Sequence, residues 1–236
     1  MAGLFDITFN HDFIIRFLSI TLIDLALSGD NAIVIGMAAA SLPLGQRKWV
    51  ILGGAILAII LRIVLTSIAT LLVLIPFLSA VGGCVLFWVA WRLLKIDTAP
   101  TADTCKDDKN ATKNFRQAIV LIVTADFMMS LDNIIAIAGA AHGNIFLLIA
   151  GLLISMPLLM GTGGAISLLI DKFKWLVYVG AAVICFTGIR MIFEDKIIEP
   201  LVPLSAIAVV IISAVCGLAI TWLFYFINKR RAASCA

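Results

Sequence analysis

Long runs of apolar residues, separated only by short polar segments, constrain this chain of 236 residues more than any other feature. Apolar residues make up 63% of the sequence and charged residues 13%, and the mean hydropathy is +1.15. A soluble domain carries about 25% charged residues to cover its surface. We therefore expect lipid to be the solvent for most of the chain, where backbone polar groups must be paired within helices or closed barrels.

Seven segments are long and apolar enough to cross the hydrocarbon as helices, which takes about 20 residues each. They are residues 13–40, 49–75, 77–95, 115–141, 145–170, 174–193 and 201–227. Pro76 separates the second span from the third, because proline cannot continue a helical hydrogen-bond ladder. Residues 96–114 form the one long polar stretch and are predicted to be a loop. The fold class expected is all-α: a polytopic membrane protein with seven transmembrane helices.

The first three predicted spans are repeated by the next three. A constant offset aligns two sets of residues, Asp24, Ser28, Asp30 and Asn31 with Asp126, Ser130, Asp132 and Asn133. Because each copy has an odd number of spans, the second copy must lie upside down, as in many secondary transporters. We predict a first three-helix repeat at 1–95, a cytoplasmic polar loop at 96–114, an inverted second repeat at 115–196, and a seventh helix with a basic cytoplasmic tail at 197–236.

The basic residues predict the orientation of the chain in the membrane. Of 17 lysines and arginines, only Arg16, Arg190 and Lys196 fall in the loops and ends on the N-terminal side, whereas nearly all others fall on the opposite side. Cytoplasmic loops carry the excess of positive charge. We therefore expect the N-terminus outside the cell and the C-terminus in the cytoplasm.

Four aspartates in the middle of apolar spans are the most costly residues of the sequence: Asp24, Asp30, Asp126 and Asp132. Each costs about 2.5–3.5 kcal/mol at the centre of a membrane helix, so a functional role is expected. On an ideal helix Asp24, Ser28 and Asn31 share one face, while Asp30 points away from it. The second motif repeats this pattern. We predict non-ideal helix near both motifs, with Ser28-Gly29 as the break in the first.

Carboxylate and amide oxygens are ligands that hard divalent cations such as Mg²⁺, Ca²⁺ and Mn²⁺ prefer. The predicted ion site therefore contains Asp24, Asp30, Asn31, Asp126, Asp132 and Asn133, and the additional candidate ligands are Ser28, Ser130, Met128 and Met129. Arg62, the lone arginine deep in a span, is expected to pair with one of the aspartates when the site is empty. The alternative is that the carboxylates only hold helices together through hydrogen bonds.

Several function classes are disfavoured. The net charge is only +3, with no basic patch interleaved with aromatic residues, so no nucleic-acid partner is expected. There is no nucleotide-binding P-loop, no nucleophile–base motif, and no metal-spaced cysteine pair. We therefore expect neither an enzyme nor a prosthetic group, and the partners predicted are the lipid bilayer and a divalent ion. A homo-oligomer is left open.

The stretches LIDLALSGDNAIVIG and ADFMMSLDNIIAIAGAA resemble the paired motifs of the TerC family, and the span order resembles its YjbE-like branch. Members are integral membrane proteins named for tellurium resistance, related to LysE-like transporters and implicated in Mn²⁺ export. The resemblance implies a bacterial cytoplasmic membrane protein that exports Mn²⁺ through the two aspartate motifs, with protons as candidate counter-ions. The alternatives are a LysE-like exporter of a cationic organic solute and a membrane partner that supplies metal to secreted proteins.

Overall fold

The computed structural model describes residues 11–68, 72, 75–97, 108–141, 145–202 and 204–234, which form eight α-helices and no strand. The helices are α1 (His11–Leu27), α2 (Gly29–Ala40), α3 (Leu44–Ser67), α5 (Leu78–Asp97), α6 (Asp108–Ala141), α7 (Ile145–Lys172), α8 (Leu176–Phe193) and α9 (Ala206–Ser234). The predicted all-α class is confirmed for the described part of the chain.

Five of the described helices, α3, α5, α7, α8 and α9, are long and apolar enough to cross a membrane, and the bent pair α1–α2 would make a sixth span. The remaining long helix is α6, whose 34 residues correspond to about 51 Å at 1.5 Å per residue. The hydrocarbon core is only about 30 Å thick. Each of the seven predicted segments thus contains helix, while the count of seven membrane crossings stays a prediction.

Two predicted boundaries are wrong. The loop expected over 96–114 is shorter, because α5 continues to Asp97 and α6 already begins at Asp108; residues 98–107 lie outside the described part. A carboxylate at the amino end of a helix is stabilised by the helix dipole, and residues 108–114 contain no glycine or proline to stop α6. The last helix begins at Ala206 rather than at 201, after turns that are hydrogen-bonded to the carbonyl of Asp195.

The predicted interruption at the aspartate motifs is present in the first motif and absent from the second. α1 ends at Leu27 and α2 begins at Gly29, with a bend of 54° between them. Ser28, between the two helices, has φ −105° and ψ 12°, which lies outside the helical region. The prediction for the second motif is wrong, because α6 runs unbroken to Ala141. Leu131, a strong helix former, stands where the first motif has Gly29.

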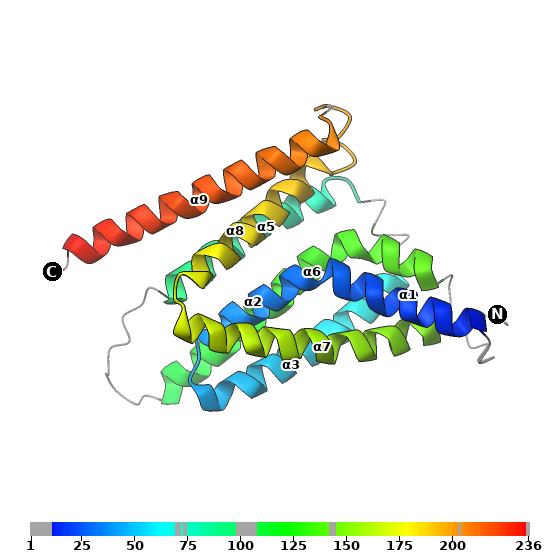
Figure 1. The fold of residues 1–236 in the computed structure, drawn as a ribbon, viewed down its shortest axis with the longest axis horizontal. Coiled ribbons are helices and arrows are strands. Elements are labelled where there is room, and N and C mark those ends of the chain that lie inside the picture. Colours follow the sequence, from blue (N-terminus) through cyan, green and yellow to red (C-terminus); the bar gives the residue numbers. More distant parts are fainter. Residues whose placement is uncertain are drawn as a thin grey trace.

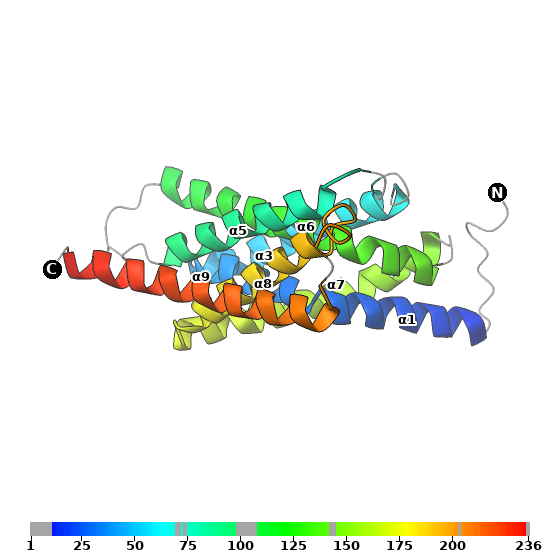
Figure 2. The same cartoon turned by 90° about the horizontal axis from the view of Figure 1, so that it is seen from above.

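The helices form two groups that run roughly along one common direction (Figures 1 and 2). One group contains α5, α8 and α9, and the other contains α1, α2, α3, α6 and α7. Contacts of α5 with α6 and of α2 with α8 join the groups. α1 begins at one end of the bundle and α9 finishes at the other, as an odd number of crossings requires (Figure 1).

The helix contacts follow the exchange of the two predicted repeats. Among the largest contacts are those of α2 with α7, α3 with α6, and α5 with α8. When each helix is replaced by its counterpart in the other repeat, the pair α2–α7 becomes the pair α6–α3. The pair α5–α8 stays the same. α3 and α7 run in opposite directions (Figure 1). Gly54 of α3 lies against Ile122 of α6, and Gly151 of α7 lies against Ile20 of α1. These two glycine–isoleucine contacts are also exchanged, as a two-fold relation between inverted halves requires.

Large apolar side chains cover the outside of the bundle. On α9, the side chains of Ile207, Ile211, Val215 and Leu218 are each more than half exposed. A soluble monomer rarely shows apolar patches of this kind, whereas a helix facing lipid needs them. The outer surface therefore agrees with the membrane environment predicted from composition.

Candidate cation site

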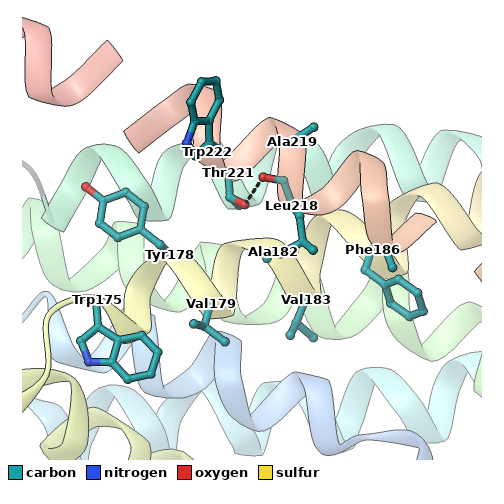
Figure 3. Close-up of a pocket in the computed structure, with 11 residues that line it drawn as sticks. Trp175, Tyr178, Val179, Ala182, Val183, Phe186, Leu218, Ala219, Thr221 and Trp222 are labelled. Carbon is teal, nitrogen blue, oxygen red and sulfur yellow. Dashed lines mark hydrogen bonds between the residues drawn. The ribbon is translucent and has the colours of Figure 1, made fainter. Parts of the chain in front are cut away.

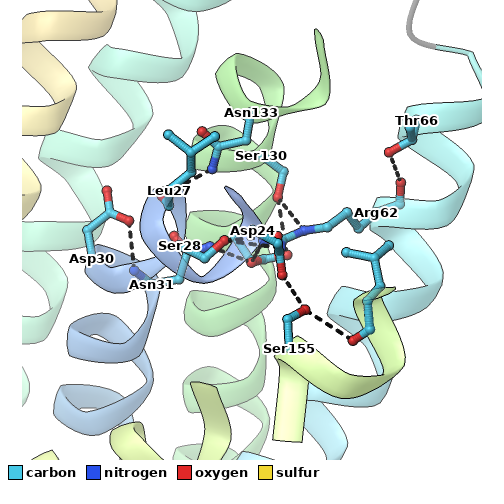
Figure 4. Close-up of polar contacts among 12 residues, drawn as sticks. Asp24, Leu27, Ser28, Asp30, Asn31, Arg62, Thr66, Ser130, Asn133 and Ser155 are labelled. Carbon is cyan, nitrogen blue, oxygen red and sulfur yellow. Dashed lines mark hydrogen bonds and ion pairs between the residues drawn. The ribbon is translucent and has the colours of Figure 1, made fainter. Parts of the chain in front are cut away.

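A buried arginine connects one carboxylate from each predicted repeat. Arg62 lies in the second half of α3, five residues before its end, and its side chain is completely buried. Its Nη1 forms an ion pair with Oδ1 of Asp24 on α1 (Figure 4), and its Nη2 lies 2.7 Å from Oδ1 of Asp126 on α6. The two aspartates are equivalent positions of the repeat, so one guanidinium joins the two halves at matching points.

A serine one helical turn after each carboxylate completes this arrangement. Ser28 donates to Oδ1 of Asp24 over 3.2 Å, and Ser130 donates to Oδ2 of Asp126 over 3.5 Å. Arg62 donates to both hydroxyls, from Nη1 and Nε, over 3.1 Å in each case. Both serines are buried. The predicted face of carboxylate and hydroxyl is therefore present in both motifs, on the broken helix as well as on the continuous one.

Asn31 links the first motif to the second and keeps one oxygen unpartnered. Its Nδ2 donates to Oδ1 of Asp126 over 2.7 Å. Because an ionised carboxylate only accepts hydrogen bonds, this contact fixes the orientation of the amide. Oδ1 of Asn31 is buried without a hydrogen-bond partner among the described residues, which costs free energy unless something binds there. The amide thus offers one free oxygen next to the carboxylates.

The break between α1 and α2 is stabilised by the motif residues themselves. Nδ2 of Asn133 on α6 donates to the carbonyl of Leu27 at the carboxyl end of α1, over 3.2 Å (Figure 4). At the amino end of α2, the backbone N–H of Asn31 donates to Oδ1 of Asp30 over 3.0 Å. Helix ends buried in lipid need such partners. The break is therefore satisfied on both sides, one of them from the opposite half.

The six predicted ion-site residues do not all meet. Asp24, Asn31 and Asp126 come together around Arg62, while Asn133 contacts the end of α1 instead. Asp30 points away, as the helix geometry predicts, and its Oδ2 accepts a hydrogen bond from Thr187 of α8 over 3.3 Å. The side chain of Asp132 lies outside the described residues.

The two methionines proposed as additional ligands pack among apolar side chains. Met129 is 3% exposed and belongs to the main hydrophobic core, and Met128 packs against the same core. Met128 also lies next to Gly82 of α5. Neither methionine has an interaction with the carboxylate oxygens in the described contacts, so their geometry is that of core residues.

Arg62 takes the place between the carboxylates that a metal ion would need. Among the described residues, no three histidine, cysteine, aspartate or glutamate side chains lie close enough together to hold a metal. Asp24 and Asp126 form a pair, supplemented by hydroxyl and amide oxygens. Such oxygens are ligands for hard divalent cations. The donor set fits a divalent ion only after the guanidinium has moved away.

Ser155 is a member of the cluster that the sequence analysis missed. Its hydroxyl, on α7, donates to Oδ2 of Asp24 over 2.5 Å (Figure 4). The signal available in the sequence is a single hydroxyl in a long apolar run, two residues before Pro157. Alignment of the repeats places it opposite Ala58, so a search restricted to matched positions overlooks it. Arg62 is unmatched in the same way, because its counterpart is Leu159.

A large apolar groove lies elsewhere, between α8 and α9 (Figure 3). Its volume is about 860 Å³, and its lining is almost entirely hydrocarbon and aromatic, with Trp175, Tyr178, Phe186 and Trp222 among the residues. The Thr221 hydroxyl in the groove donates to the backbone carbonyl of Leu218. The lining of the groove contains no carboxylate, so the polar cluster is the better candidate site for a metal ion.

A second ion pair between the halves lies at the end of the bundle. Arg47, in the first turn of α3, contacts Asp171 near the end of α7 through Nη2 over 3.0 Å and through Nη1 over 2.5 Å. The same guanidinium donates to the carbonyl of Ala40, the last residue of α2, and to that of Leu42, just after the helix. These contacts hold α2, α3 and α7 together at the end predicted to face the cytoplasm.

Comparisons with known proteins agree with the membrane architecture. A family model described as "Integral membrane protein TerC family" matches residues 9–232. The chain is 40% identical over 217 residues to the uncharacterized membrane protein YjbE of Bacillus subtilis, covering 87% of this chain and 96% of that protein. It is 24% identical to the membrane protein YceF of the same bacterium, covering 90% of this chain and 82% of YceF. No solved structure shows significant similarity.

Proposed function

Because the chain belongs to the TerC family of integral membrane proteins, we propose that it is a secondary transporter that exports a divalent metal ion, with Mn²⁺ as the first candidate, from the cytoplasm. The single observation that carries the proposal is the meeting of Asp24 and Asp126, one from each repeat, deep inside the bundle. Buried carboxylates facing a bundle interior are typical of ion pathways. The choice of Mn²⁺ follows from the family resemblance of the two aspartate motifs.

The proposed ligands are the two carboxylates together with the oxygens that surround them. Ser28 and Ser130 lie one turn beyond each carboxylate, and Asn31 supplies the unpartnered Oδ1. Ser155 orients Asp24 from α7. Asp30 and Asn133 lie beside this set, and we propose that they hold the break in position rather than bind the ion in this conformation. Asp132 stays a candidate ligand on the strength of the motif alone.

The arrangement of the helices supports transport by alternating access. The site is formed where α1, α2 and α3 of one repeat meet α6 and α7 of the other, and its side chains are buried from both ends. Transporters built from inverted repeats bind their substrate at such a midplane junction and rock one half against the other. The broken helix at Ser28 is a second feature that lines the site in such proteins.

Uptake of radiolabelled Mn²⁺ into inside-out vesicles tests the proposal, because export from the cell becomes uptake in this preparation. We expect Asp24→Asn and Asp126→Asn to abolish uptake. The matched control is Asp171→Asn, which removes a carboxylate paired with an arginine outside the site and should retain uptake. Vesicles that accumulate Mn²⁺ equally well with both site variants would overturn the site assignment.

A cationic organic solute is the second candidate substrate, and one observation favours it. The pair of Asp24 and Asp126 already holds a guanidinium, that of Arg62, in a geometry with several hydrogen bonds. A substrate with an amino or guanidino group would bind with the same chemistry. Competition separates the two candidates: excess arginine or lysine inhibits Mn²⁺ uptake only if the site accepts organic cations.

A further inference from the structure

The guanidinium of Arg62 occupies the same oxygen atoms that a transported cation needs. Nη1 contacts Oδ1 of Asp24 and the hydroxyl of Ser28, Nη2 contacts Oδ1 of Asp126, and Nε contacts the hydroxyl of Ser130. All five residues are buried. A soluble cation therefore cannot bind both carboxylates until the guanidinium leaves them, and the two cations compete directly.

The competing charge is permanent. An arginine side chain keeps its proton at any physiological pH, whereas a lysine in the same place could lose it on burial. Arg62 is a covalent part of α3, so its guanidinium is present at the site whatever the concentration of ions in solution. A soluble ion must therefore bind more strongly than one full positive charge that is already held by two carboxylates.

The valence of the soluble ion decides this competition. A monovalent ion carries a single positive charge, the same as the guanidinium that it displaces. It also lacks the planar hydrogen bonds of the arginine. A divalent ion at a similar distance has about twice the Coulomb attraction to each carboxylate. It also gains the free Oδ1 of Asn31, which Arg62 does not contact.

We propose that Arg62 is a tethered competitor that makes the site selective for divalent over monovalent cations. The inference rests on the proposed function, because it assumes that Asp24 and Asp126 bind the transported ion. Arg62 is then a specificity-determining residue: its presence lowers the affinity for all cations, and only divalent ions have enough binding energy to displace it. The repeat counterpart Leu159 carries no charge, so one arginine serves both halves.

Calorimetry of MnCl₂ binding to the purified full-length protein in nanodiscs tests the inference. The titration is done once in sodium chloride and once in choline chloride of equal ionic strength. Choline has no N–H group to donate to the carboxylates, and it controls for screening. We expect sodium to leave the affinity of the wild-type protein for Mn²⁺ unchanged. In Arg62→Gln, Mn²⁺ should bind at least about tenfold more tightly in choline, and sodium should now weaken its binding by about tenfold. Arg47→Gln, in the same helix, is the matched control and should behave like the wild type.

A purely structural role for Arg62 predicts a different result, since it gives no reason for sodium to compete only in the variant. Binding of Mn²⁺ to Arg62→Gln with unchanged affinity and no effect of sodium would overturn the inference while leaving the proposed function intact. A wild-type protein that binds no divalent ion would overturn both. Arg62→Lys covers the case in which Arg62→Gln does not fold: an ammonium has three donors where the guanidinium has five in a planar fork, so it holds the two carboxylates and two hydroxyls less firmly and sodium should compete measurably. A sodium-insensitive Arg62→Lys would contradict the inference.

Discussion

At the scale of single residues, both carboxylates of the cluster are held by neighbours from other helices. Asp24 illustrates this, because its carboxylate accepts hydrogen bonds from Ser28, from Arg62 and from Ser155. Little water reaches such a group to replace a lost partner. The geometry of the carboxylate therefore depends on hydroxyls that would be replaceable on a wet surface.

Replacing Ser155 by alanine should weaken cation binding by about tenfold, because a hydrogen bond to a buried charge contributes about 1.5–3 kcal/mol. Titration of the variant with MnCl₂ measures the effect. Ser213→Ala is the matched control: Ser213 is also a buried helical serine, but its hydroxyl on α9 has no partner in the described part of the chain. Equal affinities for the two variants would show that Ser155 does not orient Asp24.

The sequence predicts the residues of the cluster better than their partners. Mid-span aspartates are costly enough to mark Asp24 and Asp126 by themselves, and helix periodicity correctly separates Asp30 from them. Periodicity cannot show which helix supplies the opposite charge or hydroxyl. Ser155 and Arg62 lie at positions where the two repeats differ, and only their packing against α1 and α6 shows that both reach the same carboxylate.

At the scale of elements, the break between α1 and α2 depends on partners and does not require glycine. A Cβ on Gly29 would meet no atom within 4 Å, and the residue is an ordinary first residue of α2. The non-helical residue is Ser28. The sequence suggests Gly29 as the cause because glycine commonly interrupts helices, but the structure shows that the neighbouring serine carries the bend.

Gly29→Ala should accordingly retain transport and stabilise the protein slightly, by about 0.5–1 kcal/mol, since alanine favours helix more than glycine. Gly83→Ala is the contrasting variant. A Cβ on Gly83 of α5 would lie 2.2 Å from the carbonyl oxygen of Gly188 on α8, so the two helices would have to separate. Thermal unfolding in detergent should place Gly83→Ala clearly below the wild type. A destabilised Gly29→Ala would mean that the break does need glycine.

Asn133→Ala should destabilise the bend, because the carbonyl of Leu27 loses the partner that α6 provides. An unsatisfied buried carbonyl costs about 1–3 kcal/mol, which thermal unfolding of the purified protein would detect. Asn114→Ala, an exposed asparagine of the same helix, serves as control and should unfold like the wild type. If both variants unfold at the same temperature, the bend is held by other contacts.

At the scale of the whole molecule, several contacts agree with two inverted halves. The paired contacts of Gly54 with Ile122 and of Gly151 with Ile20 are exchanged by the repeat alignment. The sequence predicts this arrangement because each repeat has three spans, an odd number, so the second repeat must lie upside down in the membrane. It could not predict that α6 stays unbroken where α1 and α2 are separated by a bend, since that depends on the packing and the hydrogen bonds around Ser28.

The distribution of basic residues predicts the orientation of the whole bundle. A fluorescent protein fused to the C-terminus should fluoresce, because it folds in the cytoplasm, and alkaline phosphatase at the same place should be inactive. Phosphatase is the more direct reporter for the opposite case, since it matures only outside the cytoplasm. An active C-terminal phosphatase would show that the positive residues do not set the orientation of this chain.

The unmatched arginine has a consequence for the resting conformation of the proposed transporter. In a perfectly duplicated carrier, the states open to either side would be related by symmetry and equally populated. Arg62 stands opposite Leu159, and Ser155 stands opposite Ala58, so the contacts broken on opening to one side differ from those broken on opening to the other. Under the proposed alternating access, the resting equilibrium of the protein is therefore biased by its own sequence, before any gradient acts on it.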